Sequence, residues 1–361
     1  MSNEWADMLA KHGIVDEGNG ARVSDAGLDA AGAAPQLVDL THFTVVEITG
    51  EDAPAFLQGQ LCNDLSVVTP MHAQITGYCT PKGRLLALPI IVGTQNGFRM
   101  LVLQSVKESF LKRLRMFVMR SKVQITESED WLCSGVIADE AGSVGAAASW
   151  TGGLPGAAMD VATADTQQVI RWHDVVSGTD GGQTRARYIL LASKADQIEL
   201  WNSCPELPKR SHLQWRYGDI TAGVPSISPG VSEAFVPQML NLQLINALSF
   251  TKGCYPGQEI VARMQYLGKL KRHMRQFYRP SDTATEAEPV VPGDTLSSDV
   301  DKDAGVVVDA VTDTHGQTAI LAVMKVSSNE ATVTINDTEL VPVELPYALP
   351  SMAESAPVPD K

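Results

Sequence analysis

One cysteine of this chain lies in a turn whose neighbours could make its thiol reactive. The stretch reads Thr251-Lys-Gly-Cys-Tyr-Pro-Gly-Gln-Glu-Ile-Val-Ala-Arg263, where two glycines and a proline force a turn around Cys254. A short helix is expected to follow from Glu259, with Gln258 and Glu259 at its start. Lys252 precedes the cysteine, and Arg263 lies one short helix later. Because nearby cations favour the thiolate, the nucleophilic form, Cys254 is a candidate reactive thiol assisted by Lys252 and Arg263.

The same stretch is also compatible with a tight structural turn around a buried, inert cysteine. No histidine stands at a spacing that would identify a Cys–His pair, so covalent catalysis is not supported. The remaining cysteines, Cys62, Cys79, Cys133 and Cys204, are widely spaced and form no C-x-x-C pair. This argues against a disulfide scaffold or a zinc site and predicts a reduced, cytoplasmic protein with no bound metal. We interpret Cys62 and Cys79 as small core residues.

Several elements must position this turn. A strand is expected at Thr44–Ile48 and a helix at Glu51–Leu65, where Pro54 suits the first helical turn. Two strands, Gln74–Cys79 and Arg84–Val92, are joined by a Pro–Gly turn. Ser105–Met119 carries apolar residues close to a 3.6-residue period, which predicts an amphipathic helix. Strands among helices, with hairpins between them, favour an α+β fold.

The rest of the chain divides into further units. Residues 127–200 contain the expected strands Trp131–Asp139, Gln168–His173 and Arg187–Leu191 and a closing helix at Ala195–Ser203. From Gln276 onward, several short apolar segments separated by turn residues predict a small β-barrel. The tail from Ser351 is expected to be unstructured, as is the stretch before Leu37 apart from a short helix at Glu4–Lys11.

Composition limits the possible functions of these units. The chain has 361 residues, with 28 basic and 42 acidic ones and a net charge of −14. This balance argues against indiscriminate binding to nucleic acid. No apolar run reaches the roughly 20 residues of a spanning helix, so no membrane association is expected. Two basic segments stand out: the first basic segment, Lys107–Lys122, and the second basic segment, Arg263–Arg279. Each is either a solvated face or a site for an anion such as a carboxylate or a phosphate.

At this point the sequence resembles a known family. Lys252-Gly-Cys-Tyr-x-Gly-Gln-Glu259 is similar to the signature of the YgfZ-type folate-binding proteins, which are relatives of the aminomethyltransferase of the glycine cleavage system. The similarity covers roughly residues 37–348. It includes Phe56-Leu-Gln-Gly-Gln-Leu61 with Asn63-Asp-Leu65, Pro81-Lys-Gly-Arg84, Ser121-Lys-Val123, Ala222-Gly-Val-Pro225, Phe235-Val-Pro-Gln238 and Leu345-Pro-Tyr347.

The resemblance implies an α+β, three-domain aminomethyltransferase-like fold around a cleft for tetrahydrofolate or a derivative. The expected parts are a flexible N-terminal extension (1–36), a discontinuous folate-binding domain (37–126 plus 209–268), a ferredoxin-like α+β domain (127–208), a C-terminal β-barrel (269–348) and a tail (349–361). Family aromatics that contact folate map onto Phe43 and Trp215. The signature residues Tyr255, Gln258 and Glu259 are further candidates for cofactor binding.

The resemblance also implies a role in the maturation of iron–sulfur proteins and thereby in tRNA modification, including methylthiolation. The expected partners are iron–sulfur client enzymes and tRNA, the latter through Arg263–Arg279. The Asn-containing turn and Asp of the aminomethyltransferases are not seen here, where the chain reads Gln104-Ser-Val-Lys-Glu108, so enzymatic turnover is not the expected role. Two alternatives stay open: a folate-dependent one-carbon transferase or demethylase, using Asp64, Glu108 or Asp219, and an RNA-binding module.

Overall fold

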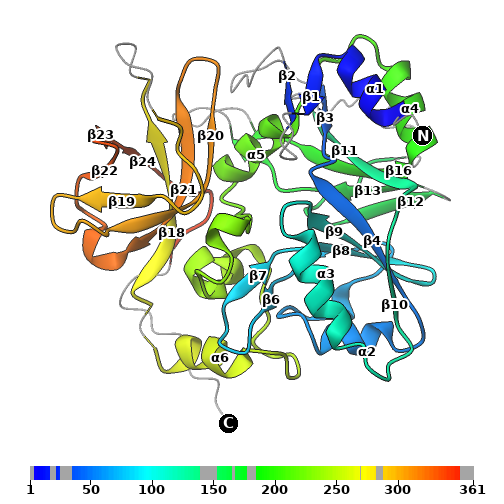
Figure 1. Cartoon of the computed structure of the whole chain (residues 1–361), viewed down its shortest axis with the longest axis horizontal. Helices are drawn as coiled ribbons and strands as arrows, with labels where there is room; N and C mark the ends of the chain where they lie inside the picture. The colour runs from blue at the N-terminus through cyan, green and yellow to red at the C-terminus, as the bar shows by residue number, and fades with distance from the viewer. Residues whose placement is uncertain are drawn as a thin grey trace.

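The computed structural model describes residues 4–16, 22–24, 35–138, 153–164, 167–176, 184–268, 270–281 and 288–349. It consists of three larger sheets, connected by helices and short 3₁₀ turns (Figure 1). A small β-barrel lies at one side of the molecule, and two mainly antiparallel sheets lie at the other (Figure 1). The predicted α+β class with a small C-terminal barrel is confirmed. The tail from Ser351, which was expected to be unstructured, lies outside the described residues.

A five-stranded antiparallel sheet carries the first helices. Its strands are, in spatial order, β10 (Gln124–Glu127), β4 (Phe43–Thr49), β9 (Gly97–Leu103), β8 (Ile90–Thr94) and β5 (Gln74–Ile75). Apolar side chains of β4 and β9, such as Ile48 and Met100, pack with those of α2 (Ala53–Gln58) and α3 (Lys107–Met116).

The helix expected over 51–65 ends at Gln58, after which Asp64 starts the 3₁₀ turn η1 (Leu65–Val67) by accepting a hydrogen bond from Ser66 N. The two strands that were expected at Gln74–Cys79 and Arg84–Val92 are each divided into two shorter strands. The short pair β6 (Tyr78–Cys79) and β7 (Leu85–Ala87) separates from the main sheet, and Pro89, which has no N–H to give a ladder, stands between β7 and β8.

A six-stranded sheet has the order β12 (Val161–Ala164), β13 (Gln167–Arg171), β16 (Arg187–Ser193), β11 (Trp131–Ile137), β3 (Gln36–Asp39) and β17 (Lys209–Arg210). Only the β3–β17 pair is parallel. The sheet of the predicted middle unit therefore includes strands from both sides of residues 127–208. The sheet is accompanied by α4 (Lys194–Ser203) and by the short pair β14 (Val175–Val176) and β15 (Thr184–Arg185).

Part of the N-terminal extension that was expected to be flexible packs against this sheet. Helix α1 (Glu4–Lys11) buries Trp5, whose ring meets that of Trp201 on α4 edge-on at 5.3 Å. Burial of one large aromatic outweighs the weak helix propensity of so short a segment. A hairpin of β1 (Ile14–Asp16) and β2 (Arg22–Ser24), which the sequence pattern did not predict, follows α1.

The barrel contains seven strands. Their spatial order is β23 (Thr338–Glu339), β22 (Val333–Ile335), β19 (Thr295–Ser298), β20 (Gly305–Thr312), β21 (Thr318–Lys325), β18 (Arg272–Arg279) and β24 (Val341–Val343). The 3₁₀ turn η6 (Val326–Ser328) follows β21. Alternating apolar residues of β20 and β21 fill its interior.

The segment between the sheets joins them. It comprises α5 (His212–Thr221), three 3₁₀ turns and α6 (Gln258–Tyr266), and Figure 1 shows α5 between the barrel and the six-stranded sheet. The 3₁₀ turns are η3 (Pro229–Val231), η4 (Pro237–Leu240) and η5 (Leu242–Ile245). One continuous buried cluster contains Val38 of β3, Val45 of β4, Trp215 of α5 and Val308 of β20. The core of the molecule is thus shared by all three sheets.

Candidate functional site

The turn around Cys254 is fixed by the residues that follow the cysteine. Gly257 has φ of +87°, a conformation that favours glycine, and it precedes the first residue of α6. Gln258 Nε2 reaches back to the carbonyls of Lys252 and Gly253, at 3.3 and 3.4 Å. Gln258 therefore closes the turn that contains Cys254. No described contact of Gln258 supports or excludes its predicted role in cofactor binding.

The Cys254 turn packs against the Pro–Gly turn between β6 and β7. A Cβ added to Gly257 would lie 2.5 Å from the carbonyl oxygen of Thr80 and 2.6 Å from the Cα of Gly83. Gly83, with φ of +69°, in turn lies against Ile260 of α6. Two sequence motifs about 170 residues apart therefore meet through their glycines, and Figure 1 shows α6 beside the β6–β7 hairpin.

Lys252 anchors the turn to the segment after α2. Its buried ammonium group donates to the carbonyls of Gln58, Leu61 and Asn63, at 2.6, 2.6 and 3.0 Å. Burial lowers the pKa of Lys252 to about 8, while the neighbouring Cys62 and Asp64 oppose that shift. The lysine of one motif thus provides the hydrogen-bond donors that the carbonyls of another motif need.

Cys62 and Cys79, which were interpreted as small core residues, are buried beside Lys252. The thiols of Cys62 and Cys79 are hydrogen-bonded to each other, and Gly77 N donates to Cys62 Sγ at 3.1 Å. Burial alone would raise the pKa of Cys62, but the hydrogen bonds from Cys79 and Gly77 and the charge of Lys252 lower it. The hydrogen bond to Cys62 and burial raise the pKa of Cys79. The 17-residue spacing of the two cysteines in the sequence does not predict that their thiols meet. An isolated antiparallel β-bridge between Leu61 and Tyr78, the residues just before them, brings them together.

Cys254 is exposed, whereas the other four cysteines are buried. The buried, inert cysteine that the sequence left open is therefore not what the structure has. The position next to it is open as well, since a Cβ on Gly253 would meet no atom within 4 Å. The ammonium of Lys252 points to backbone carbonyls, and Arg263 pairs with Glu259 at 3.1 Å across an exposed helix turn. That these two cations activate the Cys254 thiol stays a prediction.

Tyr255, the next signature residue, is buried. Its ring centroid lies 5.4 Å from Lys252 Nζ, and burial raises the pKa of its hydroxyl. Tyr255 belongs to the same buried cluster as Cys62, Cys79 and Trp215. Glu259 is mostly exposed and its side chain pairs with Arg263. The signature therefore separates into an inner part, Lys252 and Tyr255, and an outer part that includes Cys254.

Phe43 and Trp215 lie around the start of α5. Phe43, at the start of β4, is half-buried, and its ring is 4.2 Å from that of His42. The His42 ring lies 5.0 Å from that of His212, one helical turn before Trp215. Trp215 itself has no exposed surface. A ligand that stacks on its ring therefore requires neighbouring side chains to move.

Trp215 is enclosed on both sides. A Cβ on Gly135 would lie 2.7 Å from its ring, and the guanidinium of Arg187 stands 4.7 Å from its ring centroid. Arg187 is fully buried and pairs with Asp219 at 2.8 Å, and Trp172 Nε1 donates to the same carboxylate at 2.7 Å. Burial raises the pKa of Asp219, and the charge of Arg187 opposes this shift.

Arg187 is a functional candidate that the sequence analysis missed. It begins the otherwise apolar run Tyr188–Ala192 at the centre of a sheet, and a charge buried there requires a partner. That single charge beside an apolar strand was the signal available in the sequence.

The three carboxylates considered for one-carbon chemistry lie in different parts of the fold. Asp219 of α5 pairs with Arg187 and accepts a hydrogen bond from Trp172 Nε1. Asp64 accepts from Ser66 N and from Gln58 Nε2. Glu108 is exposed in the first turn of α3. Asp219 therefore lies among the side chains around α5, whereas Asp64 and Glu108 lie at η1 and α3.

The region around α5 contains the chemistry that a folate needs. Among the residues that the structure describes, buried polar atoms without a hydrogen-bond partner include Trp215 Nε1, His42 Nδ1 and Arg187 Nη2. The rings of Phe43, Trp172 and Trp215 are close to these atoms. Aromatic faces with unused hydrogen-bond donors fit a flat heterocycle with carbonyl and ring-nitrogen acceptors. These residue types are the ones that would hold a pterin, and because Trp215 is enclosed, the side chains around it must move for its ring to be reached.

In the part of the chain that the structure describes, no three His, Cys, Asp or Glu side chains cluster as metal ligands would. None of its helices combines the length and the apolar character that crossing a bilayer requires.

Comparisons with known proteins agree with this architecture. No family model matches the chain. It is 29% identical over 323 residues to the tRNA-modifying protein YgfZ of Colwellia psychrerythraea, covering 87% of this chain and 93% of that protein. It is 31% identical over 240 residues to the YgfZ protein of Edwardsiella ictaluri, covering 65% and 69%. An uncharacterized protein of Haemophilus influenzae is 32% identical over 255 residues, covering 70% and 76%.

Among solved structures, the chain is similar to the glycine cleavage system aminomethyltransferase T from Bartonella henselae. The TM-score is 0.68 with 14% sequence identity, over 93% of this chain and 94% of the other. At this identity the likeness concerns the fold, and the predicted aminomethyltransferase-like fold is confirmed.

Proposed function

The chain belongs to the YgfZ family of tRNA-modifying proteins, and we propose that it is a cytoplasmic, folate-binding accessory protein. In this role it binds tetrahydrofolate or a derivative and supports the assembly or repair of iron–sulfur clusters in client enzymes. Those enzymes modify tRNA, for example by methylthiolation. The observation that carries the proposal is the exposed Cys254 on a turn built from two family motifs, with Lys252 as the anchor between them.

The folate part of the proposal depends on the region around α5. Phe43 supplies a half-exposed aromatic edge, and Trp215 Nε1 and Arg187 Nη2 supply donors with no other partner in the described structure. When bound, a reduced folate supplies a carrier for one-carbon groups. The chain's own residues bind and orient it: the rings stack on the pterin, and the unused donors bind its acceptor atoms.

The proposed action on iron–sulfur client enzymes depends on Cys254. Its thiol is exposed, next to a glycine with open space around it, so that a partner's sulfur or a cluster can approach. Only the thiolate form reacts with such partners. Lys252 positions the turn through three carbonyls and acts through the backbone, as a positioning residue.

Titration with tetrahydrofolate tests the first part. Trp215 and Trp172 lie in the proposed site, so binding is expected to change the tryptophan fluorescence. Replacing Arg187 risks unfolding because it leaves Asp219 buried without its partner. The milder variant Phe43→Leu is therefore used, and it should weaken binding while preserving the thermal transition. No response to folate at high micromolar concentration would refute this part.

Complementation tests the second part. In a strain that lacks the protein, Cys254→Ser should fail to restore the level of methylthiolated tRNA. Thr251→Ala, which changes an exposed residue of the same turn, should restore it. Full rescue by Cys254→Ser would remove the thiol from the mechanism without affecting the folate result.

A one-carbon transferase or demethylase is the second candidate, and it requires a carboxylate that is free to transfer a proton. Asp219 and Asp64 are held by structural partners, and Glu108 is exposed on α3. Incubation with tetrahydrofolate and a one-carbon donor should give no turnover. Measurable turnover that is lost in Asp64→Asn would favour this alternative.

A further inference from the structure

The end of α3 displays apolar side chains to solvent. We define the α3 turn as Met116–Lys122, which follows the buried helical residues Phe110, Leu111 and Leu114. Met116, Phe117 and Met119 are 69%, 40% and 86% exposed. Three large apolar side chains exposed within four residues are a larger group than the single exposed residues of an ordinary surface.

The backbone of this turn is nevertheless well ordered by hydrogen bonds. Phe117 N, Val118 N and Ser121 N donate to the carbonyls of Leu114, Arg115 and Val118, at 3.1, 3.2 and 2.7 Å. At its far end, Lys122 N donates to Asp52 Oδ2 at 2.7 Å. The apolar side chains are thus presented on a fixed backbone between α3 and β10.

Met119 adds an unfavourable backbone conformation to its exposure. Its φ is +42°, in the left-handed region that residues with a Cβ rarely adopt. Glycine, which has no Cβ, adopts this conformation far more readily than methionine. Neither the strained backbone nor the exposed side chain of Met119 stabilises the protein by itself. Such strained residues concentrate at sites that bind a ligand or partner.

Cations surround the exposed apolar group. Lys112 and Arg120 are exposed, and Lys122 pairs only with the equally exposed Glu51. Arg113 places its guanidinium 5.9 Å from the ring centroid of Phe117. An exposed ion pair contributes little to stability, so Lys122 can exchange Glu51 for another anion. In a chain with a net charge of −14, this face is suited to an anionic partner.

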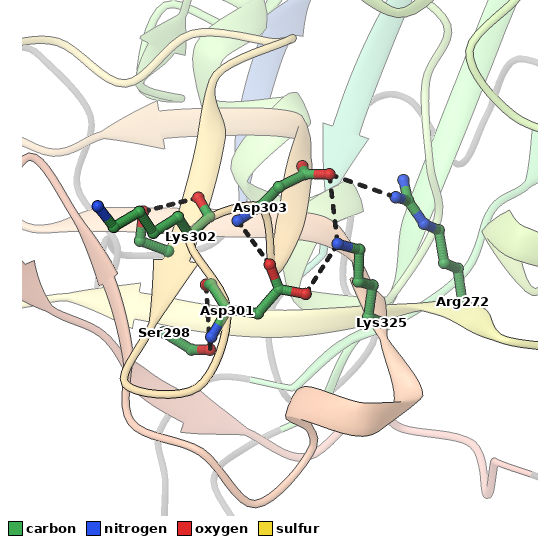
Figure 2. Close-up of polar contacts among 7 residues, drawn as sticks. Arg272, Ser298, Asp301, Lys302, Asp303 and Lys325 are labelled. Carbon is green, nitrogen blue, oxygen red and sulfur yellow. Dashed lines mark hydrogen bonds and ion pairs between the residues drawn. The ribbon is translucent and has the colours of Figure 1, made fainter.

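The second basic segment, Arg263–Arg279, differs in this respect. Arg279 is only 3% exposed and donates to the carbonyl of Glu288, and Arg275 donates to the carbonyl of Asn329. Figure 2 shows Arg272 reaching Asp303, which together with Asp301 also holds Lys325. Phe277, an aromatic residue of this segment's strand, is buried in the barrel. Arg272, Arg275 and Arg279 of this segment therefore serve the barrel's own structure.

We propose that the α3 turn is the RNA-contacting surface of this protein, with Lys112, Arg120 and Lys122 on phosphates and Phe117 under a base. The proposal rests on the proposed role in tRNA modification, which supplies RNA as the anionic partner. Aromatic rings and guanidinium groups stack on unpaired bases, and methionine sulfur also makes favourable contacts with aromatic rings. The occupant is therefore an exposed loop or single-stranded end of a tRNA.

Fluorescence anisotropy with labelled, unfractionated tRNA tests the proposal. Binding should weaken as salt rises from about 50 to 200 mM, and Lys112→Gln/Arg120→Gln should weaken it about three- to tenfold and flatten the salt dependence by about one to two counterions. Phe117→Ser should weaken tRNA binding by about tenfold and leave the salt dependence unchanged, because this variant loses a stacking contact but keeps every phosphate contact.

A matched control separates this surface from general electrostatics. Lys271→Gln/Lys302→Gln removes the same charge from exposed positions on the barrel, and the Lys302 side chain points away from the Asp301–Lys325 group in Figure 2. This variant should bind tRNA like the unmodified chain. An equal loss in both double variants would overturn the proposal.

Two further outcomes would also overturn it. No tRNA binding at low salt, or binding of vesicles of phosphatidylglycerol and phosphatidylcholine in place of tRNA, would assign the α3 turn to another partner. The tetrahydrofolate titration is carried out on the same variants and should be unchanged. Loss of RNA binding with intact folate binding then tests this surface alone, whereas loss of both would indicate a misfolded variant, which the thermal transition reveals.

Discussion

At the scale of single residues, Lys252 is the side chain on which the Cys254 turn most depends. A buried ammonium group that donates to three carbonyls cannot be replaced by an apolar side chain without leaving those oxygens unpaired. We expect Lys252→Met to lower the free energy of unfolding by about 3 kcal/mol. Urea denaturation measures this loss. Lys271→Met, at an exposed position, is the control and should change stability by less than about 0.5 kcal/mol. An equally small effect at Lys252 would show that water replaces the ammonium group.

Two buried histidines should make the free energy of unfolding depend on pH. Burial, followed by the charges of His212 and Arg216, lowers the pKa of His42 well below 6.5, and burial and Arg187 lower that of His173 to about 4. As the pH falls below 6.5, these residues take up protons in the unfolded chain but stay neutral in the folded one. Stability is therefore lost between about pH 6.5 and 4, at up to about 1.4 kcal/mol per pH unit for each histidine.

Urea unfolding at a series of pH values measures that slope. His42→Phe keeps a ring against Phe43 and His212 but cannot be protonated, so it should flatten the dependence. His315→Phe, at an exposed position, should leave it unchanged. An unaltered slope in His42→Phe would mean that carboxylates and not His42 dominate the acid response.

At the scale of elements, the contact between α6 and the β6–β7 turn depends on glycine. At Gly257 a Cβ would meet the backbone of Thr80 and Gly83, and the φ of +87° disfavours any other residue. We expect Gly257→Ala to destabilise the protein by more than about 2 kcal/mol and to expose Cys254 further, so that its thiol reacts faster with a chromogenic disulfide. Gly253→Ala, in the same turn but with open space around it, should have neither effect. Identical thiol kinetics in both variants would contradict this packing.

These elements also show what the sequence could and could not reveal. The turns at Pro81–Gly83 and Pro256–Gly257 were predictable because Pro and Gly determine backbone conformation locally. The meeting of the two turns was not, because glycine-to-glycine packing has no local signal. The same applies to β3 and β17, whose few residues pair only through partners far along the chain, and to the Cys62–Cys79 thiol pair. Aromatic positions such as Trp215 could be assigned by resemblance, but not their burial.

At the scale of the whole molecule, the barrel is held against α5 by one buried ion pair. Arg216 of α5 pairs with Asp309 of β20, at a β-bulge, and Ser226 Oγ donates to the same carboxylate at 2.9 Å. Near the C-terminal end of the described chain, Tyr347 Oη donates to the carbonyl of Gly223 at 2.7 Å. Because α5 also carries Trp215, the placement of the barrel and the geometry of the proposed folate site are connected through one helix.

This connection predicts a coupled effect. Arg216→Met leaves Asp309 buried without a cation, which should cost about 3–5 kcal/mol and weaken tetrahydrofolate binding as α5 loses its support. Adding Asp309→Leu removes the unpaired charge, so the double variant should recover most of the stability. If folate binding recovers with it, the barrel acts on the site by holding α5 in place. Recovered stability with folate binding still lost would instead mean that Arg216 or Asp309 contacts the folate directly, and hydrogen exchange of the α5 amides distinguishes the two outcomes.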